Sequence, residues 1–256
     1  MNVKDLFDIK GKKAIVTGGT RGLGHGMAEA LLEAGCEAVI IGSSDKAFEE
    51  AEAFVKRGFN CKGVKADLGN RSEVFSAFNE AVGKLSGDLD ILIIAHGIQR
   101  RHSAEVFPIK EWDEVINVNL NSVFILCKEA AGIMLKKGCG KIITISSMAS
   151  WFGGQTIPAY SAAKGGVAQL TKELSNDWFS RGINVNSIAP GYMETEMNTA
   201  LLDKTNPRYE QITARIPAGR WGTPDDMKGA AIFLASHASD YLGGCILPVD
   251  GGYLVK

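Results

Sequence analysis

A tyrosine and a lysine stand four positions apart in the segment Tyr160-Ser161-Ala162-Ala163-Lys164. In a helix, residues at i and i+4 share one face, so the phenol and the ammonium group would lie together. A tyrosine hydroxyl normally has a pKa of about 10, and a nearby positive charge favours the ionised form and lowers that pKa. Tyr160 and Lys164 therefore predict a general acid and base that exchanges a proton with a substrate oxygen.

Two polar residues precede this pair, each beside an apolar segment. Ser147 follows the predicted strand 141–146, where its hydroxyl could bind the reacting oxygen of a substrate and stabilise developing charge. Asn119 lies among apolar residues of a predicted helix, 112–136. Structural alternatives exist for both signals. A tyrosine and a lysine at this spacing occur often by chance, and an asparagine can simply mark a helix surface or kink.

A glycine-rich turn, Thr17–Gly24, lies between the first predicted strand and the first predicted helix. Glycine permits positive φ and close approach of a ligand to the backbone, and a helix start offers free N–H groups that suit a pyrophosphate. The spacing G-x-x-x-G-x-G differs from the G-x-G-x-x-G of many dinucleotide folds, and a tight turn without a ligand is the alternative. Its place in the first βαβ unit favours a dinucleotide. The residues expected to contact it are Gly18, Thr20, Arg21, Gly22, Leu23 and Gly24.

Polar and small residues at the ends of three further strands fit the same nucleotide. Asp67 could accept a hydrogen bond from an adenine amino group, or be an ordinary turn residue. No acidic residue follows the second strand before Asp45, and Arg21 could pair with a ribose 2′-phosphate. The pattern favours NADP(H) over NAD(H), unless Arg21 is only a solvated loop arginine. The strand-end residues expected at the cofactor are Ser43, Ser44, Asp67, Leu68, Ala95, His96 and Gly97.

Short apolar segments alternate with segments of helical periodicity along the whole chain. Such alternation indicates βαβ units, which build a parallel sheet with right-handed crossovers and helices on both faces. The predicted strands are 14–17, 38–41, 61–66, 91–95, 141–146, 183–189 and 245–249. The predicted helices are 22–34, 47–56, 72–85, 112–136, 159–179 and 225–236.

The connection 191–223 interrupts this alternation. It is long and rich in proline and glycine, and a connection of that length in a compact domain usually covers or binds a substrate. No linker, repeat or low-complexity segment divides the chain. We therefore expect an α/β Rossmann fold with a doubly wound seven-stranded parallel sheet. Residues 1–256 would form a single dinucleotide-binding catalytic domain, with 191–223 as its substrate loop or lid.

The composition of the 256 residues is that of a globular protein, with 45% hydrophobic and 22% charged residues. A net charge of −1 gives no reason to expect nucleic acid or an anionic membrane as a partner. Five cysteines without a C-x-x-C pair fit reduced thiols better than a disulfide framework. The start of the chain lacks the apolar core of a signal peptide, and no apolar run approaches the roughly 20 residues of a membrane span. We expect a cytoplasmic protein.

Taken together and in this order, the motifs resemble the short-chain dehydrogenase/reductase family. The resemblance extends from the glycine turn through Pro190-Gly191 to the tail 249–252. It implies that Tyr160 is the catalytic acid and base and that Lys164 lowers its pKa and binds the nicotinamide ribose. It also implies that Ser147 orients the substrate carbonyl and that Asn119 holds a water of the proton relay. The residues implied at the nicotinamide end are Pro190, Gly191, Met193 and Thr195.

One position departs from the family pattern. The family usually has Asn-Asn-Ala-Gly after the fourth strand, where this chain has Ile94-Ala95-His96-Gly97. The change removes an amide that would brace the centre of the sheet, and an imidazole could supply part of its hydrogen bonding. The other histidines form no metal-ligand spacing with His96, so no metal site is expected.

Within the family, the chain is most similar to sugar-acid dehydrogenases, through stretches such as 97–101 and 215–222. Arginine binds carboxylates in a bidentate fashion, and two arginines follow the fourth strand at the rim where a substrate would enter. Either arginine could instead be solvated or lie at a subunit contact. The implied substrates are acids of the 2-dehydro-3-deoxy-gluconate or gluconate type. The residues expected to contact substrate are Arg100, Arg101, Ser147, Gln155, Tyr160 and Tyr192.

Two rival functions remain open. The same chemistry could serve another small carbonyl compound, such as a 3-oxoacyl thioester. Alternatively, the chain could be a nucleotide-binding sensor without turnover, which the replacement at His96 would support and the intact Ser147, Tyr160 and Lys164 set opposes. The family also implies a homotetramer, with pairing expected through 241–255 and the helix after Tyr160.

Overall fold

Seven parallel strands form one sheet in this computed structural model, which describes residues 2–256. The strand order is β3-β2-β1-β4-β5-β6-β7, and every neighbouring pair is parallel. The order reverses between β1 and β4, which is where open α/β sheets bind ligands at the carboxyl ends of their strands. The strands are β1 (Lys13–Thr17), β2 (Glu37–Gly42), β3 (Cys61–Lys65), β4 (Ile91–Ile94), β5 (Gly140–Ile145), β6 (Ile183–Pro190) and β7 (Ile246–Val249).

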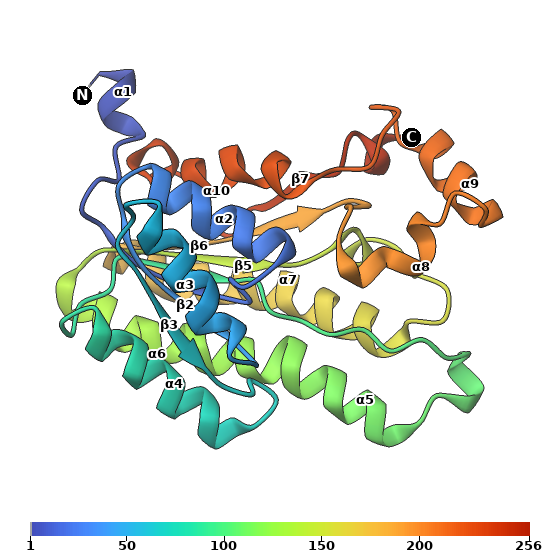
Figure 1. Ribbon diagram of the computed structural model, residues 1–256, viewed down its shortest axis with the longest axis horizontal. Helices are drawn as coiled ribbons and strands as arrows, with labels where there is room; N and C mark the ends of the chain where they lie inside the picture. Colours follow the sequence, from blue (N-terminus) through green and yellow to red (C-terminus); the bar gives the residue numbers. More distant parts are fainter. Residues whose placement is uncertain (1) are drawn as a thin grey trace.

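Helices cover both faces of the sheet, as the alternating sequence pattern predicts (Figure 1). Two separate apolar clusters result, one between the sheet and α4, α6 and α7, the other between the sheet and α2, α3 and α10. Central strands such as β4 are buried on both faces and read as continuous apolar runs for that reason. The helices are α1 (Val3–Leu6), α2 (Gly22–Glu33), α3 (Lys46–Lys56), α4 (Arg71–Lys84), α5 (Ile109–Ile116), α6 (Ser122–Lys137), α7 (Pro158–Trp178), α8 (Thr199–Leu202), α9 (Pro207–Arg215) and α10 (Lys228–Ala235).

The fourth long helical segment is not one regular α-helix. A π-helical turn over Asn117–Asn121 joins α5 to α6, and π-turns inside helices often occur at functional sites. Within the described chain, the helical stretch Ile109–Lys137 is long and apolar enough to cross a membrane by length and composition, and its most apolar 18 residues have a mean hydropathy of 1.3. Half of these residues are buried inside the protein, because α6 packs against the sheet and α4. Its apolar composition is therefore explained by its place in the core.

Residues 191–223 do not form a structureless loop. They include a turn of 3-10 helix, Glu196–Asn198, followed by α8 and α9. These helices were not expected from the sequence, because each is short and its stability depends on packing. Both helices lie beyond the carboxyl ends of the strands, on the side of the molecule that also carries the segment after β4 (Figure 1).

Candidate active site

The glycine turn brings β1 and α2 into direct contact. Gly18 and Gly22 have φ of +66° and +54°, values that residues other than glycine rarely adopt. A Cβ on Gly24 would lie 2.2 Å from the carbonyl oxygen of Gly18, so the helix can start this close to the turn only without a side chain there. No side chain of residues 2–256 caps the start of α2. Its first N–H groups therefore remain available to an anion, and this turn fits a dinucleotide pyrophosphate.

A cleft of about 870 Å³ opens beside this turn, across the carboxyl ends of strands β1 to β6. It brings together most of the residues that the sequence predicts for the cofactor and the substrate. These are Gly18, Thr20, Arg21, Gly22, Leu23, Gly24, Ser43, Asp67, Leu68, Ala95, His96, Gly97, Arg100, Arg101, Ser147, Tyr160, Lys164, Pro190, Gly191, Met193 and Thr195.

Four predicted residues do not line the cleft within the described chain, namely Ser44, Asn119, Gln155 and Tyr192. Ser44 and Gln155 are exposed, Asn119 is fully buried, and Tyr192 is half-buried in a cluster of aromatic rings. The cleft also has lining residues that the sequence analysis missed. Some of them extend predicted strand ends or the predicted lid, whereas Glu111 and Glu114 lie around the start of the predicted helix 112–136, where no motif pointed to the cleft. The missed residues are Ile41, Gly42, Ala66, Gly69, Ile98, Gln99, His102, Glu111, Glu114, Val118, Ile145, Ser146, Glu196, Met197, Asn198 and Ala200.

Tyr160 and Lys164 lie on one face of α7, as their spacing predicts. The ammonium nitrogen Nζ of Lys164 is 5.7 Å from the centre of the Tyr160 ring and donates a 2.6 Å hydrogen bond to the carbonyl of Ile145. Burial lowers the pKa of Lys164 to about 8. Burial raises the pKa of Tyr160, although the Ser147 hydroxyl and the charge of Arg101 oppose this rise. This direction is the reverse of the one that the Tyr–Lys spacing predicts, because desolvation of the phenolate outweighs the nearby charges.

Ser147 stands at the end of β5 and faces the same phenol. Its backbone is extended, its Oγ accepts a 3.1 Å hydrogen bond from the Ala149 N–H, and it interacts with the Tyr160 hydroxyl. One end of the cleft thus holds two hydroxyl groups beside a buried amine. A carbonyl or alcohol oxygen placed there can receive hydrogen bonds from Ser147 and exchange a proton with Tyr160.

Asn119 braces the segment that follows β4. It lies in the π-helical turn, and its side chain accepts a 2.9 Å hydrogen bond from the Ile98 N–H and donates a 2.8 Å bond to the Ile98 carbonyl. A Cβ on Gly97 would lie 3.3 Å from Asn119 Oδ1 and 3.9 Å from Lys164 Nζ. The structure therefore gives Asn119 a bracing contact beside Lys164. A water held by Asn119 stays a prediction.

His96 connects two strands to the π-helical turn. Thr17 Oγ1 lies 2.7 Å from Nδ1, while Ser122 Oγ and the Val118 carbonyl lie 2.7 and 3.1 Å from Nε2. The Val118 carbonyl can only accept a hydrogen bond, so these contacts assign the His96 proton to Nε2, and the Thr17 hydroxyl then donates to Nδ1. The imidazole thus braces the centre of the sheet in place of the expected asparagine amide.

Replacement of His96 by Asn should reduce the acid sensitivity of the fold. Burial, followed by the charge of Lys164, lowers the pKa of His96 from 6.5 to about 3. Below about pH 6.5 the unfolded chain binds a proton that the folded chain does not, so stability falls with the pH between about 6.5 and 3. From pH 7 to pH 5, wild type should lose about 2 kcal/mol more unfolding free energy than His96→Asn. Urea unfolding of both proteins at the two pH values measures this, and equal losses would contradict the burial of a neutral imidazole.

Two predicted cofactor residues have protein partners in the structure. The exposed Asp67 accepts a 2.8 Å hydrogen bond from the Gly69 N–H, so it shapes the turn after β3 as well as lining the cleft. Arg21 pairs with Glu196 of the lid segment, and both side chains are about two-thirds exposed. Exposed ion pairs are worth roughly 0–1 kcal/mol, so a phosphate can compete with Glu196 for this arginine.

The two adjacent arginines differ in their surroundings. Arg100 Nη2 is 2.8 Å from Glu114 Oε1, and Nε is 3.9 Å from Glu111 Oε2. These acidic residues of α5 neutralise Arg100, although both arginines line the cleft. Arg101 lies close enough to Tyr160 for its charge to affect the pKa of the phenol. Of the two arginines, Arg101 therefore has the surroundings of a substrate-binding residue.

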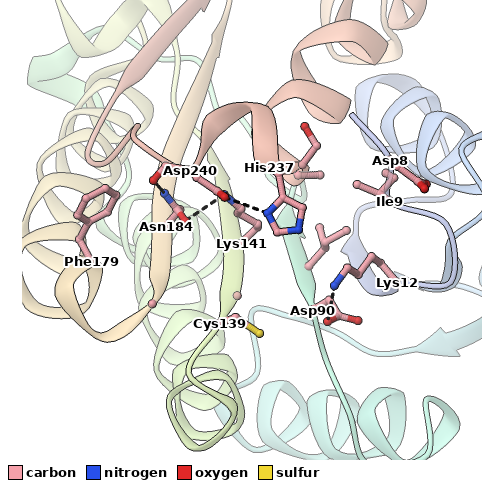
Figure 2. A pocket seen from close by; sticks show the side chains of 15 residues that line it. Asp8, Ile9, Lys12, Asp90, Cys139, Lys141, Phe179, Asn184, His237 and Asp240 are labelled. Carbon is pink, nitrogen blue, oxygen red and sulfur yellow. Dashed lines mark hydrogen bonds and ion pairs between the residues drawn. The ribbon is translucent and has the colours of Figure 1, made fainter. Parts of the chain in front are cut away.

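A second cavity, of about 310 Å³, lies at the amino ends of the strands, near the start of β5 (Figure 2). Most of its charged side chains pair with one another. Lys141 and His237 contact Asp240 at 2.7 and 2.9 Å, and Lys12 contacts Asp90 at 3.7 Å. This cavity contains none of the predicted site residues, and its paired charges give it no catalytic group comparable to Tyr160.

The fold, the glycine turn and the cleft define a dinucleotide-binding oxidoreductase, and comparison with known proteins places the chain in a family. A family model described as Enoyl-(Acyl carrier protein) reductase matches residues 18–254. The chain belongs to the short-chain dehydrogenases/reductases, the family to which that model belongs.

Individual relatives are similar over nearly their full length. The chain is 44% identical to the 2-dehydro-3-deoxy-D-gluconate 5-dehydrogenase of Bacillus subtilis, covering 98% of both chains. It is 38% identical to the gluconate 5-dehydrogenase of Gluconobacter oxydans, covering 100% of both. Among solved structures, it resembles a gluconate 5-dehydrogenase from Burkholderia cenocepacia in complex with NADP and tartrate. That match has a TM-score of 0.95 and 40% identity and covers 100% of each chain.

Proposed function

We propose that this protein is an NAD(P)-dependent oxidoreductase that interconverts a ketone and a secondary alcohol on a sugar acid. The observation that carries the proposal is the meeting of Ser147, Tyr160 and Lys164 in the same cleft as the glycine turn. The names of the relatives support a substrate of the 2-dehydro-3-deoxy-gluconate or gluconate type. The NADP in the Burkholderia structure supports NADP(H) as the cofactor, with NAD(H) as the alternative.

The bound nicotinamide would supply the hydride for reduction of the ketone and accept it in the reverse direction. In the reducing direction, Ser147 donates a hydrogen bond to the ketone oxygen and Tyr160 transfers its hydroxyl proton to that oxygen. The raised pKa of Tyr160 keeps this proton in place at neutral pH. Lys164, held by the Ile145 carbonyl, stabilises the phenolate that remains and binds the nicotinamide ribose.

The other cofactor contacts follow from the lining of the cleft. The start of α2 would bind the pyrophosphate, and the residues after β2 and β3 would bind the adenosine end. Arg21 would exchange Glu196 for a 2′-phosphate, which gives the preference for NADP(H). The nicotinamide end would lie against Pro190, Gly191, Met193 and Thr195.

The remaining organisation is also part of this proposal. Residues 1–256 would work as one catalytic domain, and 191–223 would act as a lid over the substrate. We expect a homotetramer, which is supported by exposed apolar side chains on the surfaces expected to pair, such as Tyr241 at 99% and Val255 at 86% exposure. The five free cysteines of the described chain support a cytoplasmic location.

The proposal is tested by cofactor oxidation with 5-keto-gluconate and the 2-dehydro-3-deoxy-gluconate-type diketone, with NADPH and NADH in separate reactions. We expect turnover with both sugar acids and a preference for NADPH. Arg21→Ala should lower kcat/KM for NADPH about tenfold and leave that for NADH nearly unchanged, because a charged hydrogen bond contributes about 1.5–3 kcal/mol. Turnover of 3-oxoacyl thioesters alone would favour the thioester reductase. Cofactor binding without turnover of any carbonyl compound would favour a sensor.

A further inference from the structure

The ion pair between Arg21 and Glu196 joins two separate parts of the cleft wall. Arg21 is the residue before α2, whereas Glu196 begins the 3-10 turn of the lid segment. Both residues line the cleft, and of the carboxylates in residues 2–256 only that of Glu196 lies within 4.0 Å of the Arg21 guanidinium. A Cβ on Gly22 would lie 3.6 Å from Thr195 Cγ2, so the backbone of the glycine turn also lies close to the lid here. The lid is thus in contact with the turn that is expected to hold the pyrophosphate.

Backbone hydrogen bonds fix the part of the lid that carries Glu196. Met193 is buried and forms a β-bridge with Gly222, and the Glu194 N–H donates a 2.7 Å hydrogen bond to the Gly222 carbonyl. The Asn198 side chain then donates a 2.9 Å hydrogen bond back to the Met193 carbonyl. Glu196 lies on the short turn between these anchors. The position of its carboxylate beside Arg21 therefore follows from the fold of the lid.

A ribose 2′-phosphate and the Glu196 carboxylate would compete for one guanidinium. A phosphate carries more negative charge and more acceptor oxygens than a carboxylate, and arginine binds it through paired, charge-assisted hydrogen bonds. The Arg21–Glu196 pair is largely exposed, and such pairs contribute little to stability. The neutral 2′-hydroxyl of NAD(H) cannot replace the carboxylate in the same way. NADP(H) should therefore take Arg21 from Glu196, whereas NAD(H) should leave the pair in place.

We propose that Glu196 is a specificity-determining residue that ties the lid to the glycine turn until the 2′-phosphate of NADP(H) displaces it. This inference rests on the proposed function, because it takes Arg21 as the residue that binds the 2′-phosphate. It adds a role for the lid in cofactor choice. The phosphate at the adenosine end of the cofactor would release the segment that is expected to cover the substrate, and NAD(H) would leave that segment tied.

The first test measures nucleotide binding by calorimetric titration of adenosine 2′,5′-bisphosphate and of 5′-AMP. These probes carry the adenosine ends of NADP and NAD and lack the nicotinamide that would itself contact the lid. Glu196→Gln should tighten binding of the bisphosphate about two- to fivefold and leave 5′-AMP unchanged, because an exposed ion pair is a weak competitor. Glu194→Gln is the matched control. It removes the same charge two residues earlier, where no cation of the described chain lies within 4.0 Å of the carboxylate.

The second test follows the lid directly, by hydrogen exchange of residues 195–202 measured with mass spectrometry. In wild type, the bisphosphate should speed this exchange about two- to fivefold, whereas 5′-AMP should not change it. In Glu196→Gln the exchange should already be fast, and neither nucleotide should alter it. Glu194→Gln should respond as wild type does.

The outcomes separate this inference from the proposed function, because neither test needs turnover. Equal effects of Glu196→Gln and Glu194→Gln, or tight binding of the bisphosphate without a change in lid exchange, would overturn the role of Glu196 even if wild type reduces sugar acids. Equal affinity of wild type for the two nucleotides would overturn both this role and the preference for NADP(H). Absence of sugar-acid turnover, with the lid response intact, would overturn the proposed function and leave the role of Glu196 standing.

Discussion

Replacing Tyr160 by Phe should reduce ketone reduction by about 10²- to 10⁴-fold, the range that positioned proton transfer contributes. The substitution removes one oxygen atom and keeps the ring that packs over Lys164. The ketone oxygen would then have no proton donor in contact, because Lys164 donates to the Ile145 carbonyl and Ser147 is a poor acid. The fold should persist, because the hydroxyl group interacts only with the side chains that line the cleft.

Steady-state kinetics with NADPH and a sugar acid measure this loss, and cofactor binding followed by fluorescence shows whether the site is intact. Tyr241→Phe is the matched control, because it makes the same chemical change on a side chain that does not line the cleft and keeps the apolar ring expected at the subunit contact. We expect Tyr241→Phe to keep wild-type kcat and both variants to bind NADPH as wild type does. A Tyr160→Phe protein that retains a tenth or more of wild-type kcat would show that another group supplies the proton.

Gly24→Ala should destabilise the protein by about 1–3 kcal/mol and weaken cofactor binding, because the added methyl group collides with backbone rather than with a flexible side chain. It would lie 2.2 Å from the oxygen and 2.7 Å from the carbonyl carbon of Gly18. The start of α2 would have to move away from the turn that is expected to hold the pyrophosphate. Loss of stability and loss of affinity therefore have the same cause.

Gly83→Ala is the matched control for this change. Gly83 also lies in a helix, α4. Apart from its chain neighbours and the backbone of its own helix, no heavy atom of residues 2–256 lies within 4 Å of the position of the added Cβ. Alanine is the better helix former, so this variant should gain about 0.5–1 kcal/mol. Denaturant unfolding of both variants and titration with NADPH measure the contrast. Equal stabilities, or NADPH affinity unchanged in Gly24→Ala, would contradict the packing of the turn against α2.

The sequence by itself determined the seven strands, the six long helices and most of the cleft. Strands buried on both faces are mostly apolar, so β4 and β5 can be recognised in the sequence as short apolar segments. Positions such as Ser147 and Asp67 could be placed at strand ends for the same reason. Parallel strands bring their carboxyl ends to one edge of the sheet. The residues that meet in the cleft can therefore be predicted from the whole chain even where the loop conformations are unknown.

Only the tertiary structure decided how the polar side chains pair. Arg100 and Arg101 are adjacent in sequence but differ in their partners, because α5 places Glu114 beside Arg100 only. The partners of His96 come from β1, the π-helical turn and the start of α6, and Tyr209 of the short helix α9 stacks on Trp221. Hydrophobic periodicity fixes which face of an element is buried, whereas these contacts depend on how loops and short helices pack across the cleft. The direction of the Tyr160 pKa shift also depends on the tertiary structure, because burial outweighs the charges around the phenol. The spacing of residues along the chain does not reveal this burial.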